Sequence, residues 1–259
     1  MSSTQVSPSD LYEMDELQQY FGYGLKICDG LEIHQPTVGD IVRMGEYNYF
    51  NTVNLITAIP SDMKAQLDMM GIDWETMEDF ELFCLLAPQM TLDDTRVLFG
   101  DLDFTKFKIT IPENRPEGDR TIYLKHQETG LIIDELRYKA ITNYLCHMHH
   151  IKKKPQIAGN AYTHKMLLEM AYEDMERNKK KARNEKSALK SLISTMVNMP
   201  GFKYNLQELM DVGYCQFMDS VSRIQVIEST TALMHGVYMG NVDMKKINKA
   251  DFNYMRDMS

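Results

Sequence analysis

The chain has 259 residues, 44% of them hydrophobic, and a formal net charge of −9. Its length is enough for one large domain or two small ones with a real core, and its composition is ordinary for a globular protein. The apolar runs are too short to span a bilayer, so no membrane partner is expected. The N-terminus has no basic segment followed by an apolar one, which argues against a signal peptide.

Charge is spread unevenly along the chain. Residues 1–100 hold 17 acidic and 4 basic residues, whereas residues 152–190 hold 11 basic and 5 acidic residues. Such asymmetry suits a protein that attracts an oppositely charged partner or a second copy, and it also occurs in nucleic-acid binding. The overall acidity disfavours duplex DNA, because DNA binding is driven by phosphate neutralisation.

The cysteines give no sign of a disulfide framework or of a zinc site. They lie far apart and form no CxxC pair: Cys28, Cys84, Cys146 and Cys215. Without an export signal, this pattern predicts reduced, mostly buried thiols in a cytosolic protein.

The first predicted elements are a flexible N-terminus over residues 1–22 and a hairpin-plus-helices unit over residues 23–100. Apolar and polar residues alternate from Leu25 to Ile33, and Asp29-Gly30 is a strong signal for a two-residue turn. The alternation on both sides of that turn predicts a β-hairpin.

The stretch QPTVGDIVRMGEYNYF predicts the end of a strand followed by the start of a helix. Pro36 cannot donate to a strand ladder, and Thr37 is a good N-cap with Asp40 three residues later. Gly45 is expected to interrupt this helix. Two further helices are expected over residues 61–71, with Ser61 as the cap, and over residues 76–89.

A small β element is predicted over residues 101–133, where the hydrophobic period changes. Residues 104–111 alternate, and residues 120–134 form a second hairpin pattern with its turn at Glu128-Thr129-Gly130.

Residues 134–259 predict a helical region that forms a C-terminal helical bundle. Helices are expected over 134–154, 161–198, 206–235 and 245–258, with Asn205 as a cap and Gly236 at the end of the third. The predicted fold is therefore α+β and predominantly helical.

One cluster of possible metal ligands stands out near the end of the first of these helices. Cys146, His147, His149 and His150 have helical spacings that could share a metal ion. Lys152, Lys153 and Lys154 follow at once, and their charge disfavours a cation. A polar helix end is the better interpretation, so neither a metal nor another cofactor is expected.

A basic run is the candidate for phosphate contacts. It comprises Lys179, Lys180, Lys181, Arg183 and Lys186. Acidic residues lie among these side chains and can pair with them, and no aromatic residue interleaves to stack on bases. A solvated helix face is favoured over a nucleic-acid site. The chain also lacks GxSxG, P-loop and GxGxxG motifs, so no catalytic residues and no enzymatic activity are expected.

The order of several segments resembles proteins of the tail-gene clusters of tailed phages and prophages of Gram-positive bacteria. These segments are LEIHQPTVGDIVRMGEYNYF, TAIPSDMKAQLDMMGIDWETMEDFELF, LISTMVNMPGFKYNLQELMDVGYCQFMDSVSRI and GVYMGNVDMKKINKADFNYMRDM. The nearest functional class is the tail assembly chaperone. The resemblance implies a non-enzymatic protein of the host cytoplasm that holds the tape-measure protein while tail-tube subunits assemble, with homo-oligomerisation left open.

The 21 methionines are compatible with an adaptable binding surface for such a client, although methionine also serves as core filler. The candidate partner-binding residues are Met199, Phe202, Tyr204, Met210, Tyr214 and Met218, each of which also fits a core position. Two alternatives stay open. The chain could be a structural virion component, such as a tail, connector or baseplate subunit, or a DNA-associated phage factor that uses the basic stretch 152–190.

Overall fold

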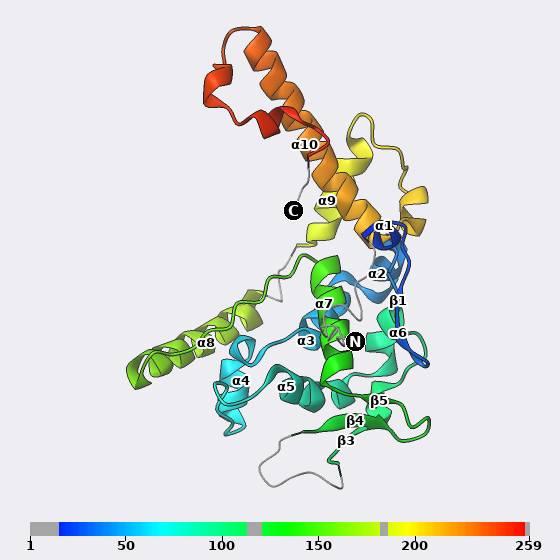
Figure 1. The fold of residues 1–259 in the computed structure, drawn as a ribbon, viewed down its shortest axis with the longest axis vertical. Helices are drawn as coiled ribbons and strands as arrows, with labels where there is room; N and C mark the ends of the chain where they lie inside the picture. Colours follow the sequence, from blue (N-terminus) through cyan, green and yellow to red (C-terminus); the bar gives the residue numbers. More distant parts are fainter. Residues whose placement is uncertain (1–15, 113–120, 182–185, 257–259) are drawn as a thin grey trace, which may run out of the picture.

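The computed structural model describes residues 16–112, 121–181 and 186–256. The fold is α+β and predominantly helical, as predicted, with one two-stranded and one three-stranded sheet. Figure 1 shows the small sheet at one end of the molecule and a long helix projecting at the other. Within the stretch expected to be flexible, residues 16–20 form helix α1 (Glu16–Tyr20) and residues 1–15 lie outside the described residues.

The N-terminal hairpin forms as predicted. Strands β1 (Leu25–Cys28) and β2 (Leu31–Ile33) pair antiparallel, and Gly30 in the turn has φ 84°, a conformation that favours glycine. Leu31 and Ile33 are fully buried, so the hairpin presents one face to the core.

The capping box at Thr37 is also confirmed. The Thr37 hydroxyl accepts from the backbone N–H of Asp40 at 3.0 Å, and the Asp40 carboxylate accepts from the Thr37 N–H at 2.9 Å. Helix α2 (Val38–Met44) starts there. Gly45, with φ 90°, then interrupts the helix before α3 (Glu46–Ile56), as the sequence predicted.

The next segment departs from prediction at two points. Ser61 does not cap a helix, because the Asp62 carboxylate accepts from the N–H of Ile59 and holds a 3-10 turn over Pro60–Asp62. Helix α4 (Lys64–Met69) therefore starts later, and α5 (Asp79–Leu86) follows as expected. Helix α6 (Leu92–Phe99) was not predicted, although Thr91 and Asp94 form the same capping box as Thr37 and Asp40.

The central β element is a three-stranded antiparallel sheet in the order β3-β4-β5. Its strands are β3 (Phe107–Thr110), β4 (Tyr123–His126) and β5 (Ile132–Ile133). Phe107, Leu124 and Ile133 are buried and carry one face of this sheet into the core.

Helix α7 (Glu135–Met148) ends earlier than predicted, so the expected helical stretch 149–154 is wrong. His150 has φ 52°, and the N–H of Ile151 reaches back to the carbonyl of Cys146 at 2.8 Å. This is the bonding pattern of a Schellman helix end, with histidine at the position that glycine usually takes. The lysines 152–154 consequently lie on a loop.

One apolar core joins the hairpin, α2, α3, α5, α6, α7 and the three-stranded sheet. We call this unit, residues 16–148, the body. Its largest fully buried side chains include Tyr49, Phe83, Phe104 and Phe107. A second, small cluster of Ala58, Leu67, Trp74 and Leu82 lies beneath α4.

The C-terminal region is more broken than the sequence indicates. The single helix expected over 161–198 is two helices, α8 (Ala161–Lys181) and α9 (Ala188–Asn198), and Lys186 and Ser187 between them are not helical. The final helix expected over 245–258 is replaced by two 3-10 turns, Met244–Lys246 and Lys249–Phe252.

The helix expected over 206–235 is interrupted by a tertiary contact. The carbonyl of Val212 accepts from the N–H of Val38 at 2.9 Å, and the N–H of Tyr214 donates to the carbonyl of Pro36 at 2.8 Å. A 3-10 turn over Glu208–Asp211 therefore precedes α10 (Tyr214–Tyr238). Gly236 does not end α10 as predicted, and the chain turns instead at Gly240, with φ 74°.

This contact docks the C-terminal region onto the start of α2. Gly39 allows the close approach, because a Cβ at this position would lie 2.5 Å from the carbonyl oxygen of Met210. The stretch that joins the hairpin to α2 is thus the site at which the C-terminal region docks onto the body.

Candidate functional site

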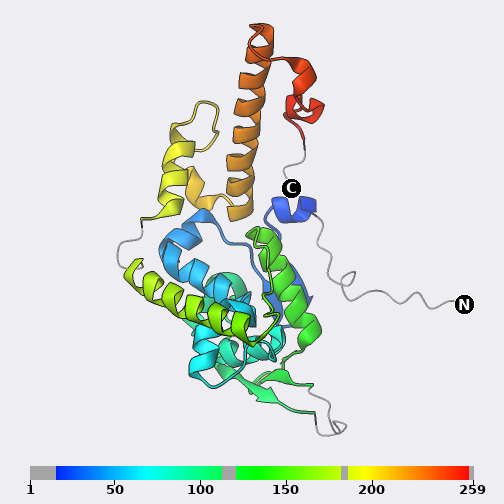
Figure 2. The same cartoon turned by 90° about the vertical axis from the view of Figure 1, so that its left-hand side faces the viewer.

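Helix α10 divides into a buried base and a projecting end. Tyr214, Phe217 and Val221 at the base are buried against the body. Beyond them the helix stands away from the body, and the chain after Tyr238 folds back alongside it, as Figure 2 shows at the top of the view. We call residues 222–256 the arm.

The arm is held together by polar groups. The guanidinium of Arg223 donates to the carbonyls of Tyr254 and Arg256 at 3.0 and 2.9 Å. The hydroxyl of Thr230 and the guanidinium of Arg256 both donate to the carbonyl of Asp251, at 3.1 and 3.0 Å. Among the described residues 222–256, Thr230 alone is buried. The arm therefore has a hydrogen-bonded interior, and its apolar side chains are at most half-buried.

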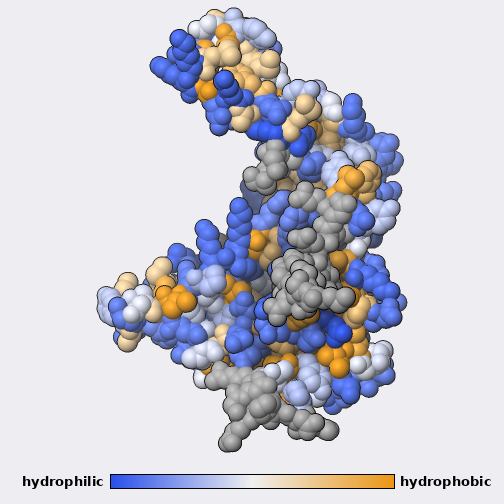
Figure 3. All heavy atoms as spheres, in the orientation of Figure 1, coloured by the Kyte–Doolittle hydropathy of each residue, from blue (hydrophilic) through white to orange (hydrophobic). Residues whose placement is uncertain are grey.

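Seven large apolar side chains of the arm are exposed, whereas others, such as Leu233, Ile247 and Phe252, are half-buried. We call the exposed set the arm surface: Ile227, Met234, Tyr238, Met239, Met244, Tyr254 and Met255. Tyr238 is 79% exposed and Met239 is 74% exposed. Figure 3 shows apolar residues, in orange, among polar ones on the arm at the top of the molecule.

Three of these residues form a stripe along α10. Met234 follows Ile227 by 7 residues, and Tyr238 follows Met234 by 4. At about 100° per residue, they fall within about 40° of one another around the helix axis. A stripe at this spacing is the pattern by which one helix packs along another.

The six partner-binding residues proposed from the sequence lie near the base of the arm instead. Tyr214 is buried, and its ring packs against Phe50 and His149. Met199, Phe202, Met210 and Met218 are half-buried, and Tyr204 is 40% exposed. The structure brings these residues to the joint between α9, α10 and the body. Sequence analysis missed the arm surface, although the spacing of Ile227, Met234 and Tyr238 was a signal that could have found it.

The basic run has two described side chains, those of Lys179 on α8 and Lys186 after it, and both are solvated. Lys179 pairs with Glu176 at 2.7 Å, and the neighbouring Arg177 pairs with Glu173 at 3.3 Å. Lys186 is exposed in the stretch before α9. Lys180 and Lys181 lie in the last turn of α8, but their side chains are outside the described part, as is Arg183 altogether.

The histidine cluster at the end of α7 is divided between core and surface. His149 lies against the rings of Tyr49, Phe50 and Tyr214, and its Nε2 is 2.9 Å from the Tyr49 hydroxyl. Burial, reinforced by the nearby His150, lowers the pKa of His149 to about 4. His147 and His150 are exposed. His149 is therefore a neutral core residue near pH 7.

The thiols offer no exposed, activated nucleophile among the described residues. All four cysteines are free; Cys84 is buried and the other three are half-buried, so the expectation of mostly buried thiols holds only for Cys84. Burial raises the pKa of Cys84 and of Cys215 to about 12. Thiols of this kind are protonated and inert near pH 7.

A cleft of about 490 Å³, lined by polar and apolar residues, lies where the loop after α7 passes α3 and α4. Its lining includes Asn51, Asn54, Gln66 and the lysines 152–154. Lys153 is bound to Asp62 at 3.2 Å on the cleft wall. The cleft is open and charged, and its contacts fix the loop to the body.

The comparisons with known proteins concern the C-terminal part of the chain. Residues 178–259 match the model of a family described as the YomV second domain. This is a phage-derived family whose namesake comes from a Bacillus prophage, so the match supports a phage protein. It covers α9, α10 and the whole arm. No curated protein and no solved structure matches the chain. No helix within the described residues is long and apolar enough to cross a membrane.

Proposed function

We propose that this chain is a phage tail assembly chaperone, which holds the tape-measure protein through the arm surface while the tail tube assembles. The observation that carries this proposal is the exposed apolar side of the arm, where seven large apolar side chains stand on a scaffold with a polar interior. The function is protein binding in the host cytoplasm and involves no catalysis.

The chemistry of the arm surface favours a helical client. Contiguous exposed apolar side chains rimmed by polar residues are typical of interaction sites. Methionine is unbranched and polarizable, so it adapts to partners of varied shape. The stripe of Ile227, Met234 and Tyr238 offers apolar anchors to an amphipathic helix laid along α10. A tape-measure protein, as the family resemblance implies, is a long helix with exposed apolar stripes.

The scaffold of the arm supports the same conclusion. Arg223, Thr230 and Arg256 bind backbone carbonyls of the returning segment, so the segment is held without use of its methionines and tyrosines. A surface held in place before binding loses less conformational entropy when the partner arrives. The arm also lies wholly within the region that matches a phage-derived family, residues 178–259.

Co-expression with the tape-measure protein of the same phage genome tests the binding surface. We expect the untagged chain to co-purify with the tagged tape-measure protein. Replacing Tyr238 and Met239 by serine should weaken co-purification at least about tenfold, because a buried aromatic anchor contributes roughly 2 kcal/mol or more. The matched control is Met69→Ser with Met70→Ser on the body, where both side chains are also exposed.

If the arm binds the client, the control variant with Met69→Ser and Met70→Ser should bind the tape-measure protein as the unaltered chain does. Equal loss in both pairs, or normal binding by the arm pair with an intact fold, would place the client surface elsewhere.

Mass spectrometry of purified phage particles tests the chaperone class separately. A chaperone leaves the tail before maturation, so we expect the chain in lysates of infected cells but not in mature particles. Many copies per particle would contradict the chaperone role and make the chain a tail, connector or baseplate component.

A further inference from the structure

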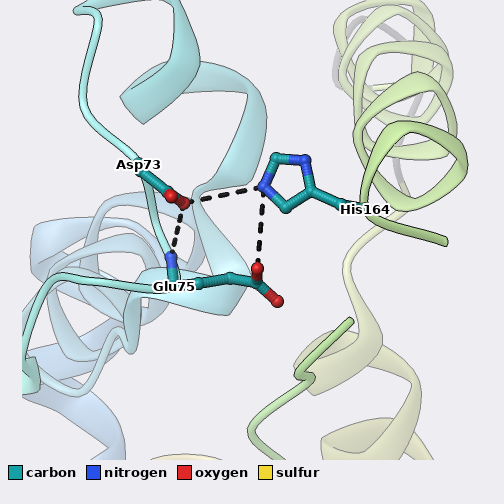
Figure 4. A group of neighbouring side chains, drawn as sticks. All are labelled: Asp73, Glu75 and His164. Carbon is teal, nitrogen blue, oxygen red and sulfur yellow. Dashed lines mark hydrogen bonds and ion pairs between the residues drawn. The ribbon is translucent and has the colours of Figure 1, made fainter. Parts of the chain in front are cut away.

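Two carboxylates of the body and one histidine of α8 converge where that helix begins. Asp73 and Glu75 belong to the loop between α4 and α5, and His164 lies in the first turn of α8. Figure 4 shows the imidazole ring directed toward both carboxylates. One ligand atom of each side chain lies within 4.8 Å of the other two. Among the described residues, no other three His, Cys, Asp or Glu side chains meet this condition.

The distances leave room for an ion between the three groups. Nε2 of His164 lies 3.6 Å from Oδ1 of Asp73 and 3.9 Å from Oε2 of Glu75. Both separations are too long for hydrogen bonds. Tetrahedral ligands with bonds of about 2.1 Å stand about 3.4 Å apart, so the separations between the histidine nitrogen and the two oxygens are close to those around a bound ion.

The histidine nitrogen itself makes no hydrogen bond, and its polar contacts are the two long ones to the carboxylates. Nε2 of His164 is also shielded from solvent. A shielded polar atom without a hydrogen bond is unusual in a folded protein and asks for an explanation, such as an ion. Here the atom points at two carboxylate oxygens, which are ligands for the same kinds of ion.

The surrounding residues fix the orientation of all three ligands. Trp74, between the two acidic residues, is buried in the small cluster beneath α4, and its indole stacks on the His164 ring with centroids 5.6 Å apart and planes at 12°. Oδ1 of Asp73 also accepts from the N–H of Glu75 at 2.9 Å. The two acidic residues therefore flank an anchored residue in the chain, and the imidazole ring stacks on that residue.

The segment that leads into α8 is tied to the same place. Oε1 of Glu75 accepts from the N–H of Ala158 at 2.5 Å, which leaves Oε2 toward the histidine. The ammonium of Lys64 donates to the side chain of Gln156 at 2.6 Å. Hydrogen bonds of this kind orient metal ligands in established sites.

We propose that Asp73, Glu75 and His164 bind a divalent transition-metal ion of the Zn²⁺ class, which clamps the start of α8 to the body. One imidazole and two carboxylates suit Zn²⁺, whereas Mg²⁺ and Ca²⁺ favour oxygen-only sites. The Asp73 side chain is 51% exposed and that of Glu75 is 24% exposed, so an ion has access from solvent and can keep a water ligand. The site stands apart from the arm and does not depend on the chaperone proposal.

Calorimetric titration of the untagged, chelator-treated full chain with Zn²⁺ alone tests this site. We expect one ion per chain and a metal-dependent rise in Tm, because an ion that binds only the folded state stabilises it. His164→Gln and Asp73→Asn should each weaken binding at least about tenfold. The control His147→Gln removes an exposed histidine from α7 and should bind Zn²⁺ as the unaltered chain does.

Circular dichroism and visible spectra distinguish a variant that has lost a metal ligand from one that has not folded. Circular dichroism of the metal-free variants should match that of the unaltered chain, and Co²⁺ in place of Zn²⁺ should give a tetrahedral visible spectrum that His164→Gln abolishes. Binding that survives His164→Gln would overturn the assignment. So would the absence of saturable binding, which would leave His164 with only its long contacts to the two carboxylates.

Discussion

The body and the arm place their large apolar side chains in opposite ways. The body buries its large apolar side chains, with Tyr49, Phe83, Phe104 and Phe107 all inaccessible to solvent. The arm keeps its methionines and tyrosines outside and places Thr230, Arg223 and Arg256 inside. Burial of apolar area is the main favourable term in folding, and the body uses it far more than the arm does. This difference is the reason for proposing that the arm surface binds a partner.

The largest expected effect comes from truncating a buried ring of the body. Phe104→Ala removes contacts with Phe83, Phe99 and Phe107 and should reduce the free energy of unfolding by about 3–5 kcal/mol. Tyr254→Ala in the arm should change it by less than about 0.5 kcal/mol, because the Tyr254 carbonyl that binds Arg223 remains. Urea unfolding of both variants measures the contrast, and similar losses would show that the arm has a core of its own.

A smaller effect is the pH dependence of stability that His149 gives to the body. His149 is neutral in the folded body down to a pKa of about 4, but the unfolded chain takes up its proton near pH 6.5. The unfolded state then binds more protons, so the stability that neutral His149 supports is present above pH 6.5 and is lost as pH falls toward 4.

Between pH 7.5 and pH 5 this loss amounts to about 2 kcal/mol in the free energy of unfolding, from 1.4 kcal/mol per pKa unit. Denaturant unfolding at the two pH values should show that His149→Gln removes this part of the pH dependence. His147→Gln should keep it. An unchanged pH dependence in His149→Gln would mean that the imidazole is not held neutral by the core.

The most localised effect is expected in the arm. Arg223→Ala removes the guanidinium that binds the carbonyls of Tyr254 and Arg256, which should destabilise the returning segment by about 1–3 kcal/mol. Amide hydrogen exchange in residues 250–256 should speed up about tenfold or more while exchange in the body stays unchanged. Arg177→Ala on α8, whose partner Glu173 is exposed, is the control. Faster exchange throughout the body would contradict the independence of the two regions.

Prediction from sequence succeeded where a signal was local. The hairpin at Asp29-Gly30 and the capping box at Thr37 depend on neighbours within a few residues, and both form as expected. The same kind of signal at Thr91 and Asp94 was available for α6 but was not used. Such features depend on backbone sterics and short-range hydrogen bonds, which can be predicted from the types of neighbouring residues.

Prediction failed where distant residues decide the backbone. The break before α10 arises because Val212 and Tyr214 bond to Val38 and Pro36, more than 170 positions earlier in the chain. The candidate binding residues differ in exposure for the same reason, since Tyr214 is buried against the body and Met210, which lies close to Gly39, is half-buried. Helical period alone cannot distinguish a stripe that meets the core from one that meets solvent.

The sequence by itself determined the fold class, the hairpin, most helices of the body and the lack of recognisable catalytic motifs. The tertiary structure alone decided which methionines are exposed, that His149 is a core residue, and that Asp73, Glu75 and His164 meet. The stretch from Pro36 to Gly39 illustrates both. Its capping box depends on neighbouring residues, whereas its contact with the C-terminal region depends on the distant backbone groups that bond to it. Local sterics can be derived from neighbouring residues, whereas burial and long-range pairing depend on how the whole chain packs.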